Sequence, residues 1–374
     1  MTENEDETET EGTEETEETE ETEETSSEPS LSTTDAVAFL VSESSHDGNN
    51  LYSVNSANVV SPAGSRWNVS AIYGQGSNIV LKTTATGLNG AIAHYFIGSD
   101  NTVQKIESSS DFRMINSQGD VVFNDLKIYR KATSTFEDST TSLSSSTIFF
   151  SSGNFLVIGD VSGSTKQAFD TLTSARYNIA SCNGPNLWGL SNAVAYVSDC
   201  GTDHIMDMAT GNRTTQASAT NGTGWPNHEG ITVSDGAVVI SQSCSLLATG
   251  VADSSQSYGI CHITPTGTWT QLVTDAISPG TAGLDGRNTV LFNYGSDKFI
   301  VKELTQISLI VRSTSTKTAI LSGYNVISVS LSDSFVYYVA EDNFGKKVVG
   351  KYDIATQGNS NLDTDITFSS IQVR

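Results

Sequence analysis

The sequence predicts an all-β protein, and three observations lead to this prediction. Short apolar runs rich in Val, Ile, Tyr and Phe recur along the chain, and Gly, Ser, Asp or Asn bounds them, which is typical of strands separated by turns. No apolar pattern with helical spacing extends over several turns. A strand–turn–strand unit also recurs. It is clearest at 192–211, with strands at 193–197 and 204–208 around a polar turn.

Residues 1–33 differ in composition from the rest of the chain. The first 30 residues hold 15 Asp and Glu and no Lys or Arg, and Glu-Glu-Thr repeats from Thr13 to Thr25. Like charges repel and no apolar residue is available for burial, so we expect a disordered acidic tether. It resembles the spacer that follows the lipid-modified cysteine of bacterial surface lipoproteins. That resemblance implies a lipid anchor through an N-terminal cysteine that this sequence lacks.

Residues 34–374 are expected to form one β domain. Outside the tether the charge is ordinary, with 28 acidic and 19 basic residues and no basic patch, which argues against a nucleic-acid partner. No run of about 18 apolar residues could span a membrane. Acidic residues follow Met1 almost at once, and no apolar run comes after them, so we expect no signal peptide in this sequence.

The expected strand segments follow one another with polar turns between them. The first half begins with AVAFLV and NLYSV around a polar loop, and paired apolar runs continue after it. The second half repeats the same alternation with Val, Ile and Tyr in the runs. The segments are 36–41, 50–54, 70–74, 78–84, 91–98, 103–107, 112–115, 121–125, 126–131, 147–160, 193–208, 230–241, 259–267, 289–293, 298–304, 326–342 and 347–358.

Four of these segments can be superposed on one another: YFIGSDNTVQKI, YVSDCGTDHIMDM, LFNYGSDKFIVKEL and YYVAEDNFGKKVVGKYD. Four strands in about 40–50 residues are typical of propeller blades, and a ring of small sheets hides strand edges without helices. About 48 residues per blade predicts a β-propeller of seven four-stranded blades, and six or eight blades also fit. We expect the N-terminal strand to complete the last blade and so close the ring, which pairs 36–41 with 366–373. A pair of β-sandwiches is the alternative fold.

The four cysteines form two neighbouring pairs. Cys182 and Cys200 are 18 positions apart, and Cys244 and Cys261 are 17 apart, with no CxxC spacing of a zinc or redox site. We predict two local disulfides, and four buried thiols are the alternative. Disulfides indicate an oxidising compartment, hence a secreted or cell-surface protein in the periplasm or outside the cell.

The segments GPNLWGLSNAVAYVSDCGTDHIMDMATG and WPNHEGITVSDGAVVIS resemble blades of NHL-type and gluconolactonase-like β-propellers. The resemblance covers 184–241 and, less closely, 326–356. It implies that Glu229, in the Glu-Gly-Ile position, helps to hold a divalent metal with Asp199 or Asn183. Oxygen ligands of this kind suit Ca²⁺. Matching ligands are absent from the other expected blades, and a solvated loop acid is the alternative interpretation of Glu229.

Three further residues are candidates for binding. His228 and Trp225 precede the inner strand of an expected blade, and Trp188 lies in the blade before it. A surface histidine and tryptophans packed between blades are the alternatives. No G-x-S-x-G elbow or phosphate-binding glycine loop occurs.

Two functions follow from these features. The first is a non-enzymatic extracellular or cell-surface propeller that binds a protein or glycan, which fits the tether, the cysteine pairs and the missing catalytic motif. The second is a Ca²⁺-dependent lactonase or esterase-type hydrolase with its site at the channel. Structural assembly is a third possibility.

Overall fold

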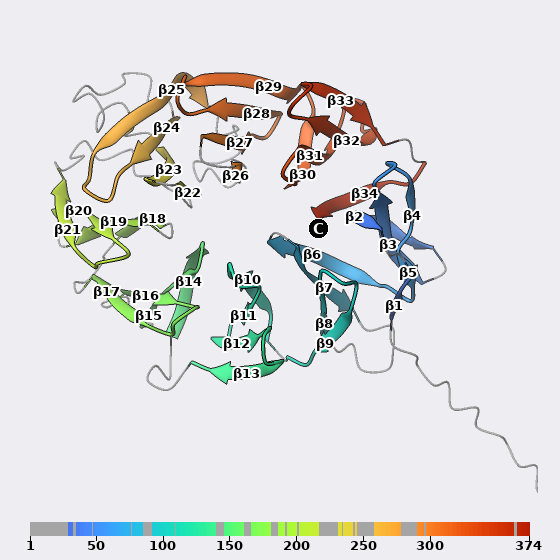
Figure 1. Cartoon of the computed structure of the whole chain (residues 1–374), viewed down its shortest axis with the longest axis horizontal. Helices are drawn as coiled ribbons and strands as arrows, with labels where there is room; N and C mark the ends of the chain where they lie inside the picture. Colours follow the sequence, from blue (N-terminus) through green and yellow to red (C-terminus); the bar gives the residue numbers. More distant parts are fainter. Residues whose placement is uncertain are drawn as a thin grey trace, which may run out of the picture.

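The computed structural model describes most of the chain after residue 28. The described residues are 29–32, 35–46, 48–75, 77–84, 92–108, 110–139, 146–160, 166–180, 186–190, 193–199, 202–216, 231–233, 235–241, 244, 258–277, 290–294, 297–362 and 365–374. They form eight four-stranded antiparallel sheets arranged as the blades of a ring, together with one two-stranded sheet (Figure 1). The all-β propeller is confirmed, and the alternative of paired sandwiches is excluded.

Each blade is an antiparallel sheet whose first strand lines the centre of the ring (Figure 1). From the centre outward, blades 1 to 4 are β34 (Phe368–Val373), β2 (Ala36–His46), β3 (Asn49–Asn55), β4 (Val60–Pro62); β6 (Val69–Gln75), β7 (Asn78–Thr84), β8 (Ile92–Ile97), β9 (Val103–Ile106); β10 (Phe112–Ile115), β11 (Val121–Phe123), β12 (Lys127–Arg130), β13 (Thr135–Asp138); and β14 (Ser146–Ser152), β15 (Phe155–Asp160), β16 (Lys166–Asp170), β17 (Arg176–Ala180).

The second half of the ring repeats this plan. Blades 5 to 8 are β18 (Asn186–Leu190), β19 (Val194–Asp199), β20 (Thr202–Asp207), β21 (Arg213–Gln216); β22 (Ile231–Val233), β23 (Gly236–Ser241), β24 (Tyr258–Ile263), β25 (Trp269–Ile277); β26 (Val290–Tyr294), β27 (Lys298–Lys302), β28 (Gln306–Val311), β29 (Thr316–Ser322); and β30 (Asn325–Leu331), β31 (Phe335–Glu341), β32 (Lys347–Asp353), β33 (Gly358–Asn361).

The number of blades is eight, within the expected range, although seven was favoured. The blades need about 42 residues each rather than 48, because most of their turns are tight. One apolar cluster of buried side chains lies between each pair of neighbouring blades in the described part of the chain, which gives eight clusters. The core is therefore a ring of interfaces, and each blade is stabilised by burying both of its faces.

The ring closes through its first blade. β34 pairs with β2 in the register Ala38↔Val373 to Ser42↔Phe368, so the expected pairing of 36–41 with 366–373 is confirmed. However, the C-terminal strand supplies the innermost strand of blade 1, where the N-terminal strand was expected to complete the last blade. The adjoining β30 supports it, since the backbone N–H of Val373 donates to Ser330 Oγ at 2.8 Å.

The two faces of the ring carry different connections. Turns between the first and second strands, and between the third and fourth strands, lie on one side, which we call the turn face. Connections between the second and third strands, and those between blades, lie on the other side, which we call the loop face. All eight third-to-fourth-strand turns contain one residue with positive φ, and only two of these residues are glycines. They are Asn58, Asn101, Ser134, Ser174, Gly211, Gly267, Ser315 and Gln357.

The propeller begins slightly before residue 34. Ser30–Leu31 (β1) pairs with Gly64–Ser65 (β5), and the Trp67 indole N–H donates to the carbonyl of Ser30 at 3.0 Å. Residues 29–32 therefore pack on the ring although the sequence placed them in the tether. A Cβ at position 64 would lie 1.8 Å from the Ser30 carbonyl oxygen, so only glycine permits this contact. Residues 1–28 lie outside the described residues.

One of the two expected disulfides is present. Cys244 and Cys261 are bonded, with their Cα atoms 5.6 Å apart, and both are buried in the cluster between blades 5 and 6. Cys182 and Cys200 lie outside the described residues, so their pairing remains a prediction. In the described part of the chain no helix is long and apolar enough to cross a membrane.

Candidate functional site

Most of the predicted site residues lie outside the described part of the chain. This applies to Trp225, His228, Glu229 and Asn183. The metal site and the Trp225–His228 binding site therefore remain predictions. Among the described residues, no group of three or more His, Cys, Asp or Glu side chains could hold a metal ion.

The backbone positions of the other two candidates are known. Trp188 lies in β18, at the irregularity where the pairing with β19 shifts between Leu187 and Gly189. Asp199 is the last residue of β19 and pairs with Thr202. β19 therefore ends on the loop face, where β21 also ends and β22 begins. The topology places Asp199, the end of β21 and the start of β22 on one face of the ring.

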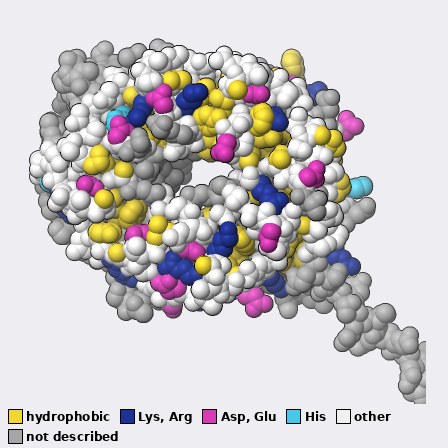
Figure 2. Space-filling model, viewed as in Figure 1, with side chains coloured by type: hydrophobic (Ala, Val, Ile, Leu, Met, Phe, Trp, Pro, Cys, Tyr) yellow, Lys and Arg dark blue, Asp and Glu magenta, His cyan; other side chains and the backbone are white. Residues whose placement is uncertain are grey.

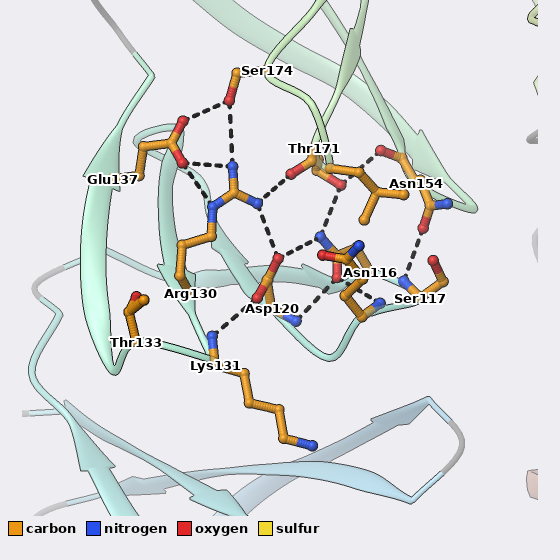
Figure 3. Close-up of polar contacts among 12 residues, drawn as sticks. Asn116, Ser117, Asp120, Arg130, Lys131, Thr133, Glu137, Asn154, Thr171 and Ser174 are labelled. Carbon is orange, nitrogen blue, oxygen red and sulfur yellow. Dashed lines mark hydrogen bonds and ion pairs between the residues drawn. The ribbon is translucent and has the colours of Figure 1, made fainter.

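The most extensive polar network that the structure describes lies on the turn face, between blades 3 and 4 (Figure 3). Arg130, the last residue of β12, is at its centre. Its Nε donates to Glu137 Oε2 at 2.7 Å, and its Nη1 donates to Asp120 Oδ2 at 2.9 Å. Nη1 also donates to the carbonyl of Thr171 at 2.6 Å, and Nη2 donates to Ser174 Oγ at 3.3 Å. One guanidinium thus joins three turns of two blades.

The hairpin between β10 and β11 holds Asp120 in place (Figure 3). Asn116 Nδ2 donates to Asp120 Oδ2 at 3.1 Å, and the backbone N–H of Lys131 donates to Asp120 Oδ1 at 3.0 Å. Asn154 of blade 4 accepts the backbone N–H of Ser117 at 2.8 Å. The Asp120 side chain is 4% exposed, so these bonds replace its hydration.

The positive charge of Arg130 is paired with the carboxylates of Asp120 and Glu137. Burial tends to lower the pKa of Arg130, but hydrogen bonds to Asp120 and Glu137 outweigh it and raise the pKa. The hydrogen bond from Ser174, followed by that from Arg130, lowers the pKa of Glu137. An arginine that is always charged and a Glu137 carboxylate whose pKa is lowered do not exchange protons near neutral pH. The network is suited to fastening two blades together, not to acid–base catalysis.

A second charged cluster on the turn face joins blades 6 and 7. Asp235 Oδ1 lies 3.1 Å from His262 Nε2 and accepts a hydrogen bond from Arg312 Nη1. Burial lowers the pKa of His262, and the Arg312 bond lowers the pKa of Asp235. Arg312 Nη1 also lies 3.4 Å from His262 Nε2. The arginine therefore lies next to the ring nitrogen with which His262 would accept a proton if it acted as a general base. This His–Asp pair therefore also serves as an interblade contact.

The loop face presents a large apolar side chain to solvent. Phe344, in the turn between β31 and β32, is 95% exposed. Asp342 fixes this turn, because its Oδ1 accepts the backbone N–H groups of Phe344 at 2.8 Å and Lys346 at 2.9 Å. Gly345 completes the turn at φ +80°. The aromatic ring is thus presented on an ordered backbone rather than on a loose loop.

The centre of the ring is open in the space-filling view (Figure 2). Hydrophobic side chains gather beside the opening near blades 7 and 8 (Figure 2). The innermost strands of these blades carry the partly exposed apolar residues Phe292, Ile327 and Val329. Phe292 and Val329 pack against the cluster between blades 7 and 8, and Ile327 packs against the cluster between blades 8 and 1.

Sequence reasoning did not find Arg130 or Phe344. Arg130 lies in a turn without glycine, and its partners come from positions up to 44 residues away. For Phe344 a signal was present, since one aromatic residue stands in the polar run Glu341 to Lys347. The neighbouring Asp342 caps its own turn, as expected for Asp in tight turns.

Comparison with known proteins supports the fold and no family. No family model matches the chain, and no curated protein matches it. Among solved structures, apo AztD from Citrobacter koseri has a TM-score of 0.50 at 10% identity, covering 90% of this chain and 97% of that one. At this identity the likeness shows the propeller fold alone.

Two further structures are similar at lower scores. Puromycin hydrolase has a TM-score of 0.49 at 9% identity, covering 80% of this chain and 54% of that one. The chain therefore spans about half the length of that enzyme. The β-propeller domain of the Trilobed protease from Pyrococcus furiosus has a TM-score of 0.44 at 10% identity, covering 79% of this chain and 97% of that domain.

Proposed function

We propose that this protein is a non-enzymatic propeller that binds a protein partner outside the cell through its loop face. The observation that carries the proposal is Phe344, which is 95% exposed on a hydrogen-bonded turn. Aromatic side chains are common anchors of protein interfaces, and an ordered turn reduces the entropy lost on binding. A phenylalanine has no polar group for sugar hydroxyls, which favours a protein over a glycan.

The two faces differ in a way that supports this choice. On the turn face, the described charged clusters around Arg130 and Arg312 form hydrogen bonds within the ring. On the loop face, β21 and β25 end, and the predicted binding residues Trp225 and His228 follow β21 in the sequence.

The proposed location rests on the disulfide and on the tether. Cys244–Cys261 is buried between blades and fits an oxidising compartment. The acidic segment before Ser30 would hold the ring away from a cell surface, and a lipid anchor on a preceding cysteine is part of this proposal. The chain enters the ring at blade 1, beside the loop-face segment that contains β5.

A photo-crosslinking experiment tests the choice of face. The crosslinking amino acid p-benzoylphenylalanine replaces Phe344 in one variant and Ser315 in a control variant, where it lies on the turn face. Both are produced in the native host and irradiated on intact cells. We expect one discrete protein adduct from position 344 and none from position 315. Equal adducts from both positions, or none from either, would refute a protein-binding loop face.

A Ca²⁺-dependent lactonase or esterase with a site at the channel is the second candidate. The observation that favours it is the position of Asp199 on the loop face, where β21 ends and β22 begins. Calcium held by Glu229, Asp199 and Asn183 would stabilise the native state by mass action. A thermal melt in EDTA, repeated with added Ca²⁺, should then show a rise of several degrees that Glu229→Gln abolishes. An unchanged melt argues against both the metal and the enzyme.

A further inference from the structure

A buried histidine lies in the interface between blades 2 and 3. His94, in the middle of β8, is 0% exposed, and its ring meets the Phe123 ring of β11 edge-on at 5.2 Å. Neither ring nitrogen has a hydrogen-bond partner. A neutral imidazole without partners already carries a cost of burial, and a charged one would carry a far larger cost.

The groups around His94 offer little to an added positive charge. Lys82 is its direct neighbour on β7, and Ile106 is its neighbour on β9. From blade 3, Phe123 faces the ring, and the adjoining cluster is apolar except for the hydroxyls of Tyr129 and, from blade 2, Tyr73. The acidic group that acts on His94 is Asp111, and it already accepts a hydrogen bond from Lys82 Nζ at 2.7 Å.

We propose that His94 is an acid-sensitive switch that opens the interface between blades 2 and 3. Protonation places an imidazolium against the Phe123 ring, with Lys82 as its neighbour on β7. Asp111 is the acidic group that acts on it, so the imidazolium gains a countercharge by drawing Asp111 away from Lys82 or by moving into water. Either movement separates β8 from β11 and weakens the Lys82–Asp111 contact between the two blades.

The direction of the pH effect follows from linkage. Burial, followed by the charge of Lys82, lowers the pKa of His94, and Asp111 opposes this only in part. The unfolded or open form therefore binds the proton more tightly than the closed form. The closed interface keeps its full stability above the ordinary histidine pKa of about 6.5 and loses it as the pH falls below that value. At pH 5.5 one such proton favours opening by up to about tenfold.

His262 is a second buried histidine, in the interface between blades 6 and 7. Asp235 Oδ1 is 3.1 Å from its Nε2, and Arg312 Nη1 lies 3.4 Å from the same nitrogen. Burial lowers the pKa of His262 as well, so acid should also weaken that interface, and it does not serve as a reference.

Native-state hydrogen exchange of the full chain at pH 7.5 and 5.5, corrected for intrinsic rates, tests the proposal. In the wild type we expect the opening of peptides in β8 and β10–β11 to rise up to about tenfold at pH 5.5, while peptides of β31 and β32 in blade 8, which hold no histidine, change little. His94→Leu and His94→Gln remove the proton site with different shapes, and His46→Gln, at an exposed position, is the control.

The variants decide the outcome even if one of them is less stable, because each is compared with itself at the two pH values. The pH-dependent rise at blades 2 and 3 should be absent in both His94 variants and kept in His46→Gln. A rise that persists in His94→Leu and His94→Gln would overturn the proposal, and so would an opening spread evenly over all eight interfaces.

Discussion

Replacing Arg130 by Met tests whether the network between blades 3 and 4 fastens the ring. Methionine keeps much of the aliphatic stem and removes the guanidinium, so the change isolates the polar contacts. Asp120, whose side chain is 4% exposed, would lose the 2.9 Å bond from Nη1 and keep those from Asn116 and Lys131. The carbonyl of Thr171 would lose its 2.6 Å donor.

The expected cost follows from this burial. Removing one partner of a buried ion pair costs about 3–5 kcal/mol. We expect the lower end, about 3 kcal/mol, because Asp120 keeps two donors and the Glu137 side chain is 42% exposed. Glu137→Gln removes the exposed part of the pair and should cost less than about 1 kcal/mol.

Urea unfolding monitored by circular dichroism measures both variants. A double-mutant cycle with Asp120→Asn separates the pair from its surroundings, and we expect a coupling of about 2 kcal/mol. If Arg130→Met costs no more than Glu137→Gln, or if the cycle shows no coupling, the network does not stabilise the interface and our reasoning is wrong.

Three further predictions concern single positions. Ser315→Gly should stabilise the ring by about 0.5–1 kcal/mol, because Ser315 has φ +51° and glycine adopts this conformation without strain; Thr314→Gly, measured in the same melts, should not stabilise it. Cys244→Ser should cost about 3 kcal/mol, the value for a loop of this size, and any remaining effect of dithiothreitol on its melting would report the predicted Cys182–Cys200 bridge. Phe344→Ala should leave the melting temperature unchanged and weaken partner binding at least tenfold, because the side chain is 95% exposed in the free ring; a large loss of stability would mean that it packs within the protein.

The fold was predictable because a propeller repeats its local pattern. Strand–turn–strand units identified the blades, and the pairing of 36–41 with the C-terminal strand followed from the need to hide strand edges. The blade number was harder to predict, since the connections between strands vary in length. The turns between the third and fourth strands would have predicted the number of blades better. One positive-φ residue marks each of them, often after a Thr, as in Thr173-Ser174 and Thr210-Gly211.

The candidate site was less predictable, for a physical reason. Arg130 fastens two blades because it donates hydrogen bonds to Thr171 and Ser174 of the next blade. Local sequence patterns do not indicate such contacts between blades. His94 is similar, because its alternation on β8 predicts burial but not the absence of a partner. The resemblance to gluconolactonase-like blades directed attention to Glu229, which lies outside the described residues.

The closure of the ring through β34 has a consequence for how the chain folds as it is made. Val41 and Ser369, which meet in blade 1, are 328 positions apart. Bringing such distant strands together costs on the order of 5 kcal/mol of chain entropy if the residues between them are unfolded. If the other seven blades have already folded, the two strands are held close together and this cost is almost absent. A ribosome must therefore release β34 (Phe368–Val373) before the innermost position of blade 1 can be filled. Until then β2 keeps an open strand edge that a chaperone would need to shield from other chains.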